Sequence, residues 1–141
     1  MSYDPNNIFG KILRGEAPAV KVHEDEHTLV IMDIMPQAEG HTLILTKEPA
    51  ATIFEMTPDG VAACIKVTQR VAKAVRSALN PAGVMIAQFN GAAAGQTVPH
   101  VHFHVIPRNA NEPLRAHARD MADPAQLEAL AARIREALAR V

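Results

Sequence analysis

Cysteine is almost absent from this chain, and its scarcity excludes two kinds of structure. Cys64 is the one cysteine among 141 residues, so no intramolecular disulfide can form. A zinc site built from several cysteines is excluded for the same reason. Stability must therefore come from a hydrophobic core, and a chain near this length can bury roughly 70% of its unfolded surface.

The sequence also lacks a strong charge of either sign and a long hydrophobic run. The formal net charge is −1 and no basic run stands out, which argues against duplex nucleic acid as a partner. No apolar stretch approaches the ~20 residues of a membrane span. Residues 1–7 are polar and lack the apolar segment of a signal peptide. We therefore expect a soluble, cytoplasmic protein with no nucleic-acid and no membrane partner.

What the chain does have is a succession of strand-like and helix-like segments. β-forming runs predict strands at residues 20–24, 28–33, 41–46, 84–89 and 98–106. Apolar spacings of three and four predict helices at residues 8–14, 58–79 and from 123 onward. Short turns join most of the strands, so we predict a single α+β domain over residues 1–141 around an antiparallel sheet.

The long central helix carries one apolar stripe that could face either its own sheet or a partner molecule. Its start is marked by a capping threonine, a proline at the first helical position and an acid in the first turn. The stripe consists of Val61, Cys64, Ile65, Thr68, Ala72, Val75 and Leu79.

Three of the seven histidines stand two residues apart, at His100, His102 and His104. Because strand side chains alternate between the two faces, all three imidazoles are expected on one face, with the apolar residues between them packing behind. One interpretation is three individually satisfied polar groups on a solvated face. A second is a metal site, since His-x-His is a common ligand spacing on a strand and His41 could add a nitrogen.

A third interpretation is nucleophilic catalysis at phosphorus, and the residues before the histidines favour it. A histidine nucleophile divides one displacement into two easier ones through a covalent intermediate. The middle residue, His102, has a histidine on either side, which makes it the natural nucleophile. The preceding loop, residues 90–97, is rich in small residues and glycine, so its backbone amides could wrap an anion.

Several motifs together resemble the histidine triad (HIT) family of nucleotide hydrolases and transferases. The run His100-Val-His102-Phe-His104-Val-Ile resembles the family signature, in which three histidines alternate with apolar residues. The resemblance covers residues 6–108 and leaves residues 109–141 as a tail and helix like the variable tail of bacterial members. Further resembling motifs, in the family order, are Ile8-Phe9-Gly10-Lys11-Ile12, Gly15-Glu16-Ala17-Pro18, Asp33-Ile34-Met35-Pro36, Gly40-His41-Thr42-Leu43-Ile44 and Gly95-Gln96-Thr97-Val98.

The resemblance implies a HIT-like fold and a role for each matching residue. The fold would be a five-stranded antiparallel sheet with one long helix, a short N-terminal helix and a C-terminal helix, usually in a homodimer. His102 would be the nucleophile, His100 would orient it, His104 would contact the phosphate and help protonate the leaving group, and His41 looks like the additional site histidine. The implied nucleotide contacts are Asp33 at the ribose hydroxyls, Ile8, Phe9, Ile12 and Ile34 around the base, and Asn90, Gly95, Gln96 and Thr97 around the phosphate.

The implied reaction is hydrolysis of a nucleoside phosphoramidate, an acyl-adenylate or a dinucleoside polyphosphate, with a purine nucleotide as substrate. No metal cofactor is required, although a divalent ion could assist with polyphosphates. Some bacterial members bind zinc through cysteines near the N-terminus, but Gly10 stands at the corresponding position, so we expect no metal ligands here. Two alternatives remain open: a metal-binding module that uses the histidine face, and a nucleotide-binding scaffold protein.

Overall fold

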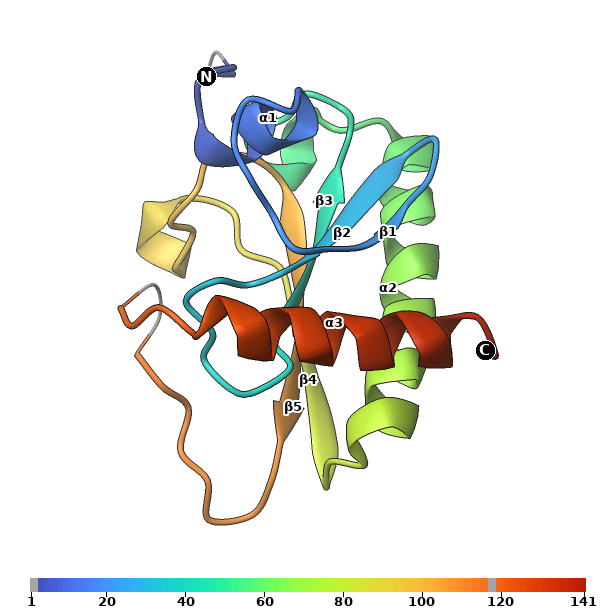
Figure 1. Cartoon of the computed structure of the whole chain (residues 1–141). Helices are drawn as coiled ribbons and strands as arrows, with labels where there is room; N and C mark the ends of the chain where they lie inside the picture. Colours follow the sequence, from blue (N-terminus) through green and yellow to red (C-terminus); the bar gives the residue numbers. More distant parts are fainter. Residues whose placement is uncertain (1–2, 117–118) are drawn as a thin grey trace.

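The computed structural model describes residues 3–116 and 119–141 and contains one antiparallel sheet with three α-helices (Figure 1). The five strands lie in the order β1-β2-β3-β5-β4, and every neighbouring pair is antiparallel. The predicted α+β fold is therefore confirmed. In chain order the elements are α1 (Ile8–Leu13), β1 (Lys21–Glu24), β2 (Thr28–Met32), β3 (Thr42–Thr46), η1 (Ile53–Glu55), α2 (Pro58–Leu79), β4 (Gly83–Ala87), η2 (Ala92–Ala94), β5 (His102–Arg108) and α3 (Pro124–Leu138).

The helices begin where their capping residues predict. Asn7 accepts a hydrogen bond from the Gly10 amide, Thr57 from the Gly60 amide, and Asp123 from the Ala125 amide. Each cap satisfies an amide that the first helical turn leaves without a partner. α2 ends at Asn80, whose left-handed backbone (φ 48°) stops the helix.

The last strand starts later than the sequence predicts. Residues 98–101 were expected to belong to the strand, but the ladder begins at His102 and continues to Arg108. Pro99 has no amide hydrogen to contribute to a ladder, and the His100 amide turns back onto the Val98 carbonyl at 2.8 Å. His100 therefore precedes the strand, and its backbone is held outside the regular pairing.

Most of the expected stripe on α2 packs into the core, and one of its residues does not. Of the stripe, Cys64, Thr68 and Val75 are buried, and Val61, Ala72 and Leu79 pack partly buried against the core. Val71 and Ala74, which the stripe did not include, are also buried. Ile65, which the stripe included, is 46% exposed. It lies at the edge of the stripe, one residue (about 100°) round the helix from Cys64, and borders a surface hollow with Val84 and Ile86 of β4.

The two faces of the sheet are covered very differently. Val30, Ile44, Phe103 and Val105 point into a large cluster with α2 and α3, which cross one another on that side (Figure 1). The opposite face carries a small cluster with α1. Among the described residues, no helix is both long and apolar enough to cross a lipid bilayer.

Candidate functional site

Four buried histidines meet on the sheet face that α1 covers. His102 and His104 lie on β5 with ring centroids 4.8 Å apart, and Phe9 of α1 stands edge-on to His102 at 4.8 Å. His100 precedes the strand but remains on the same side of the sheet, since its ring also stands edge-on to Phe9, with ring centroids 6.3 Å apart. His41, just before β3, lies against His104 with ring centroids 5.1 Å apart. The expected row of imidazoles is therefore present, with His41 behind its far end.

The hydrogen bond of His102 assigns its tautomer. Nδ1 lies 2.6 Å from the carbonyl oxygen of His100. A carbonyl can only accept, so Nδ1 carries the proton and donates it. The basic lone pair of the neutral ring is then on Nε2, the nitrogen that a nucleophilic role requires.

A hydrogen bond joins His41 to His104, and it gives His104 the tautomer opposite to that of His102. The Gln37 amide donates to Nδ1 of His41 at 3.1 Å, so the proton of His41 is on Nε2. That proton is donated to Nδ1 of His104 at 2.9 Å. His104 consequently carries its own proton on Nε2. The site thus places an acceptor nitrogen on His102 beside a donor nitrogen on His104.

His100 is held through both of its ring nitrogens. Nε2 donates to the Thr46 carbonyl at 2.7 Å, and Nδ1 lies 2.6 Å from the Tyr3 hydroxyl. Burial lowers the pKa of His100, an effect that the hydrogen bond to the Thr46 carbonyl opposes only in part. The ring is therefore neutral near pH 7, and its own carbonyl is the acceptor that orients His102.

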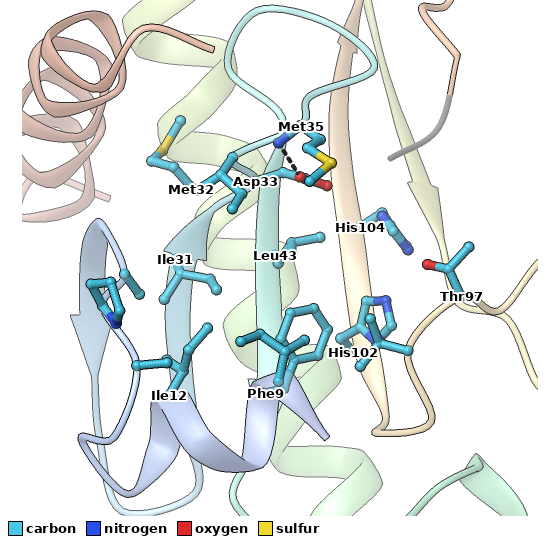
Figure 2. A pocket seen from close by; sticks show the side chains of 16 residues that line it. Phe9, Ile12, Ile31, Met32, Asp33, Met35, Leu43, Thr97, His102 and His104 are labelled. Atoms are coloured by element: carbon cyan, nitrogen blue, oxygen red, sulfur yellow. Dashed lines mark hydrogen bonds between the residues drawn. The ribbon is translucent and has the colours of Figure 1, made fainter. Parts of the chain in front are cut away.

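A cavity of about 310 Å³ opens between α1 and the histidine face of the sheet (Figure 2). Its walls are mostly apolar, and His102 and His104 stand at one side of it with Thr97 beyond them (Figure 2). This volume and composition are typical of small-molecule sites. The lining residues are Ile8, Phe9, Ile12, Ala17, Pro18, Ala19, Ile31, Met32, Asp33, Ile34, Met35, Leu43, Thr97, Val98, His102 and His104.

Asp33 supplies a carboxylate to the rim of this cavity. Its side chain is 13% exposed, one oxygen accepts a hydrogen bond from the Met35 amide at 2.8 Å, and the other lies 3.5 Å from Nδ1 of His41. The turn that carries Asp33 is fastened by the segment after β5, because the Arg115 amide donates to Gln37 and the Ala122 amide to Ile34. The carboxylate is therefore held in place.

The sequence expectations divide into residues that reach the cavity and residues that support it. Ile8, Phe9, Ile12, Asp33, Ile34 and Thr97 line it, as do His102 and His104. His41 and His100 do not line it and contact the other two histidines from behind. The cavity is also lined by residues that the sequence did not single out. Alternation along β2 and β3 could have identified Ile31 and Leu43 as facing the histidine side. Residues 17–19 gave no such signal, apart from the resemblance of residues 15–18 to a family motif.

The loop residues Asn90, Gly95 and Gln96 shape the approach to Thr97 and do not line the cavity. Gln96 accepts from the Gly91 amide at 2.7 Å and donates to the Ala51 and Val98 carbonyls at 2.6 and 2.9 Å. The Asn90 side chain accepts from the Ile53 amide at 2.7 Å. Gly95 has a φ of 104°, a conformation that other residues rarely adopt.

One group of side chains in the described part of the chain has the composition of a metal site. Ligand atoms of Asp33, His41 and His104 all lie within 4.8 Å of one another. Two ring nitrogens of this group, Nε2 of His41 and Nδ1 of His104, already face each other in a hydrogen bond. These nitrogens share a proton at 2.9 Å, so the arrangement as it stands is a hydrogen-bonded relay.

The fold and the row of buried histidines beside an apolar cavity define a histidine-triad protein. Comparison with known proteins gives the family: a sequence profile described as the HIT domain matches residues 14–111. The chain belongs to the HIT family.

Individual relatives extend this result. A crystal structure of a Hit-like protein from Bartonella henselae superposes with a TM-score of 0.91 at 41% identity, covering 97% of this chain and 99% of that one. The crystal structure of a zinc-bound histidine triad protein from Mycobacterium smegmatis superposes with a TM-score of 0.83 at 38% identity, covering 96% of this chain and 94% of that one. An adenosine 5′-monophosphoramidase from Schizosaccharomyces pombe is 38% identical over 105 residues, covering 74% of this chain and 76% of its own. Relatives with a nucleotide hydrolase activity therefore occur within this family.

Proposed function

We propose that this protein hydrolyses nucleotides at the α-phosphate through a covalent intermediate on His102. The observation that carries the proposal is the pair of complementary ring nitrogens at the cavity, a lone pair on Nε2 of His102 beside a proton on Nε2 of His104. A nucleophile and a neighbouring proton donor are the two groups that displacement at phosphorus needs.

In the first step, Nε2 of His102 attacks the α-phosphorus of a nucleoside phosphoramidate. The P–N bond breaks, and the leaving amine takes up one proton through His104. The phosphorylated ring becomes an imidazolium, and its Nδ1–H bond to the His100 carbonyl strengthens as positive charge develops there. With an acyl-adenylate or a dinucleoside polyphosphate, a P–O bond breaks instead, and the carboxylate or nucleotide leaves as an anion without taking up a proton.

In the second step, water attacks the same phosphorus and the bond to His102 breaks. With a phosphoramidate, the proton released from the water replaces the one that the amine took from His104; with the other substrates it passes to the solvent. The product is a nucleoside monophosphate. The base lies against the apolar wall that Ile8, Phe9, Ile12 and Ile34 contribute, while the Asp33 carboxylate accepts hydrogen bonds from the ribose hydroxyls. The Thr97 hydroxyl and the preceding loop contact the phosphate oxygens.

Similarity to the fission yeast phosphoramidase supports adenosine phosphoramidate as the first substrate to test. Purified protein should be assayed with adenosine phosphoramidate, an acyl-adenylate and diadenosine polyphosphates, each with and without chelator. We expect turnover that survives chelation with the first two substrates, and divalent ions to assist only with polyphosphates. Rapid acid quenching followed by peptide mass analysis should find a nucleoside monophosphate on the peptide containing His102. Turnover without any adduct, or an adduct elsewhere, would contradict the proposed nucleophile.

Zinc binding is a second candidate, because the Asp33, His41 and His104 cluster has suitable ligands and the mycobacterial relative is zinc-bound. Titration of the metal-free protein with zinc, followed by calorimetry, tests it against His41→Gln as the control variant. Tight binding that His41→Gln abolishes, together with loss of hydrolysis on adding zinc, would favour a metal-binding role over catalysis.

We also propose that the protein forms a homodimer through the outer face of α2. β4 is an edge strand, and its Ile86 is 48% exposed. Ile86 lies beside the exposed Ile65 at a surface hollow that Ala72 and Val84 also line. Exposed apolar groups on adjacent elements favour burial against a second copy. Light scattering should report a dimer, and Ile86→Asp should yield a monomer.

A further inference from the structure

Tyr3 lies before the first helix, outside every motif that resembles the family, and yet it contacts the histidine row. Its hydroxyl oxygen is 2.6 Å from Nδ1 of His100, and its ring stands edge-on to that imidazole with centroids 5.6 Å apart. The same oxygen accepts a hydrogen bond from Nδ2 of Asn7 at 2.9 Å. From these contacts we infer that Tyr3 is a positioning residue for His102, acting through His100.

Donor and acceptor can be assigned for each hydrogen bond that links Asn7, Tyr3, His100 and Thr46. Because Nε2 of His100 donates to the Thr46 carbonyl, Nδ1 must be an acceptor, and the Tyr3 hydroxyl must donate to it. Asn7 is itself fixed, since its side-chain oxygen accepts the Gly10 amide and its nitrogen also donates to the Asp4 carbonyl at 2.8 Å. A continuous donor-to-acceptor path therefore runs from Asn7 through Tyr3 and His100 to Thr46.

This path matters because His100 stands just outside the sheet. β5 begins at His102, and the backbone bonds that follow His100 are those of Val101, whose amide donates to the Ala50 carbonyl at 2.9 Å and whose carbonyl accepts from the Thr46 amide at 3.2 Å. On the His100 side no ladder bond follows among the described residues, and the imidazole of His100 is held at both nitrogens. The same residue presents the carbonyl that accepts Nδ1–H of His102 at 2.6 Å. The Tyr3 hydroxyl consequently influences the orientation of the His102 ring without reaching the cavity.

Gly10 gives the hydroxyl the space it needs. A Cβ at this position would lie 3.2 Å from the Tyr3 oxygen, 3.3 Å from Nδ2 of Asn7 and 2.8 Å from the Pro5 carbonyl oxygen. Backbone at Pro5 cannot easily withdraw, so a side chain here would displace the network. Tyr3, Asn7 and Gly10 thus form one unit around the far side of His100.

Tyr3→Phe tests the inference because it removes the hydroxyl and keeps the aromatic contact with His100. The test rests on the proposed hydrolysis, so wild-type turnover of adenosine phosphoramidate is measured first. We expect kcat to fall about tenfold or more while KM stays within about twofold, because loss of the hydroxyl misplaces the nucleophile without changing the cavity. Asn7→Asp should give a smaller loss of kcat, since it retains a helix cap and offers the Tyr3 hydroxyl a competing acceptor. Asn6→Asp, at the exposed neighbouring residue, is the matched control.

A second readout separates this inference from the proposed reaction. In protein labelled with ¹⁵N-histidine, Tyr3→Phe should shift the ring-nitrogen resonances of His102 as well as those of His100, whereas Asn6→Asp should shift neither. Loss of activity accompanied by those shifts supports the positioning role. Unchanged His102 resonances, or a kcat within twofold of wild type, would overturn it. If the wild type hydrolyses nothing, the proposed function fails, and the His102 resonances alone decide whether Tyr3 positions that ring.

Discussion

The two faces of one sheet differ in what covers them, and the difference separates stability from chemistry. On the helix face, β2, β3 and β5 contribute residues to a cluster closed by the 22-residue α2 and the 15-residue α3. On the histidine face, the same strands are covered by α1, which has six residues. A helix of that length covers part of the sheet only, and the remainder is the cavity.

Alternation along each strand sends neighbours to opposite faces. Ile44 belongs to the helix-face cluster, while Leu43 and Leu45 pair across the sheet with His104 and His102. A substitution on one face can therefore be compared with its immediate neighbour on the other. The comparison holds if helix-face changes reduce stability with little loss of turnover per folded molecule, and histidine-face changes do the reverse.

The largest effect is expected from His102→Ala. Removal of the nucleophile should reduce kcat on the order of 10⁴-fold, while the melting temperature stays close to that of the wild type because the ring borders a cavity. Binding of the nucleoside monophosphate, measured by calorimetry, should persist. His102→Gly should recover part of its activity with added imidazole. Retention of most of the activity by His102→Ala would remove the basis for the proposed mechanism.

The next effect should come from Ile44→Ala on the helix face. Ile44 is fully buried, so truncation should lower the free energy of unfolding by about 2–5 kcal/mol. At a temperature where the variant is folded, kcat should stay within a few-fold of wild type. The matched change is Leu43→Ala, which borders the cavity and should raise KM while costing less stability. Equal activity losses from the two variants would break the comparison between the faces.

A smaller effect is expected from Asp33→Asn. The amide keeps the size of the side chain but loses the charge that strengthens hydrogen bonds to two ribose hydroxyls, which is worth about 1–2 kcal/mol. We expect KM to rise roughly tenfold with little change in stability. The 2′-deoxy substrate provides the control: its KM should differ much less between wild type and variant. An equal rise for both substrates would place the carboxylate away from the ribose.

Sequence patterns predicted the fold well because its signals are local. Capping residues located the three helices, and β-forming runs located β1 to β4 to within a residue or two. The start of β5 was missed because the path of residues 98–101 depends on bonds to Thr46 and Ala50, which are distant in sequence. On α2 the apolar stripe predicted the buried face except at Ile65, because apolar spacing alone does not say where the edge of a buried face lies.

The candidate site was predictable in composition and much less so in organisation. The spacing of His100, His102 and His104 identified the row, and the motif resemblance identified His41 and Asp33. The tautomers could not be predicted, because they depend on the carbonyls of His100 and Thr46 and on the amide of Gln37. Tyr3 gave no signal at all, since its contact with His100 spans 97 positions of the chain.

The smallest expected effect is a difference between the faces in their response to mild acid. Burial lowers the folded-state pKa of His100 from an ordinary value of 6.5, so the unfolded chain binds a proton first as the pH falls. The contribution of His100 to stability is therefore complete above about pH 6.5 and is lost progressively below it. Asp25, in the turn between β1 and β2, does not interfere. Burial alone would raise its pKa, but hydrogen bonds from His27, His23 and Thr28 lower it to about 2, so its contribution is lost only in stronger acid.

The pH-dependent contribution of His100 to stability can therefore be measured by comparing the melting temperatures of wild type and His100→Gln between pH 7.5 and 5.0. His100→Gln keeps a donor for the Thr46 carbonyl and removes the titrating ring. We expect it to be less stable than wild type at pH 7.5 but to lose less stability on acidification, so the two curves should converge. Ile44→Val, a helix-face control that leaves every ionisable group in place, should shift the whole curve downward without changing its slope. Parallel curves for wild type and His100→Gln would show that His100 titrates alike in the folded and unfolded chains, and the burial of its neutral ring would then contribute nothing to the pH dependence of the fold.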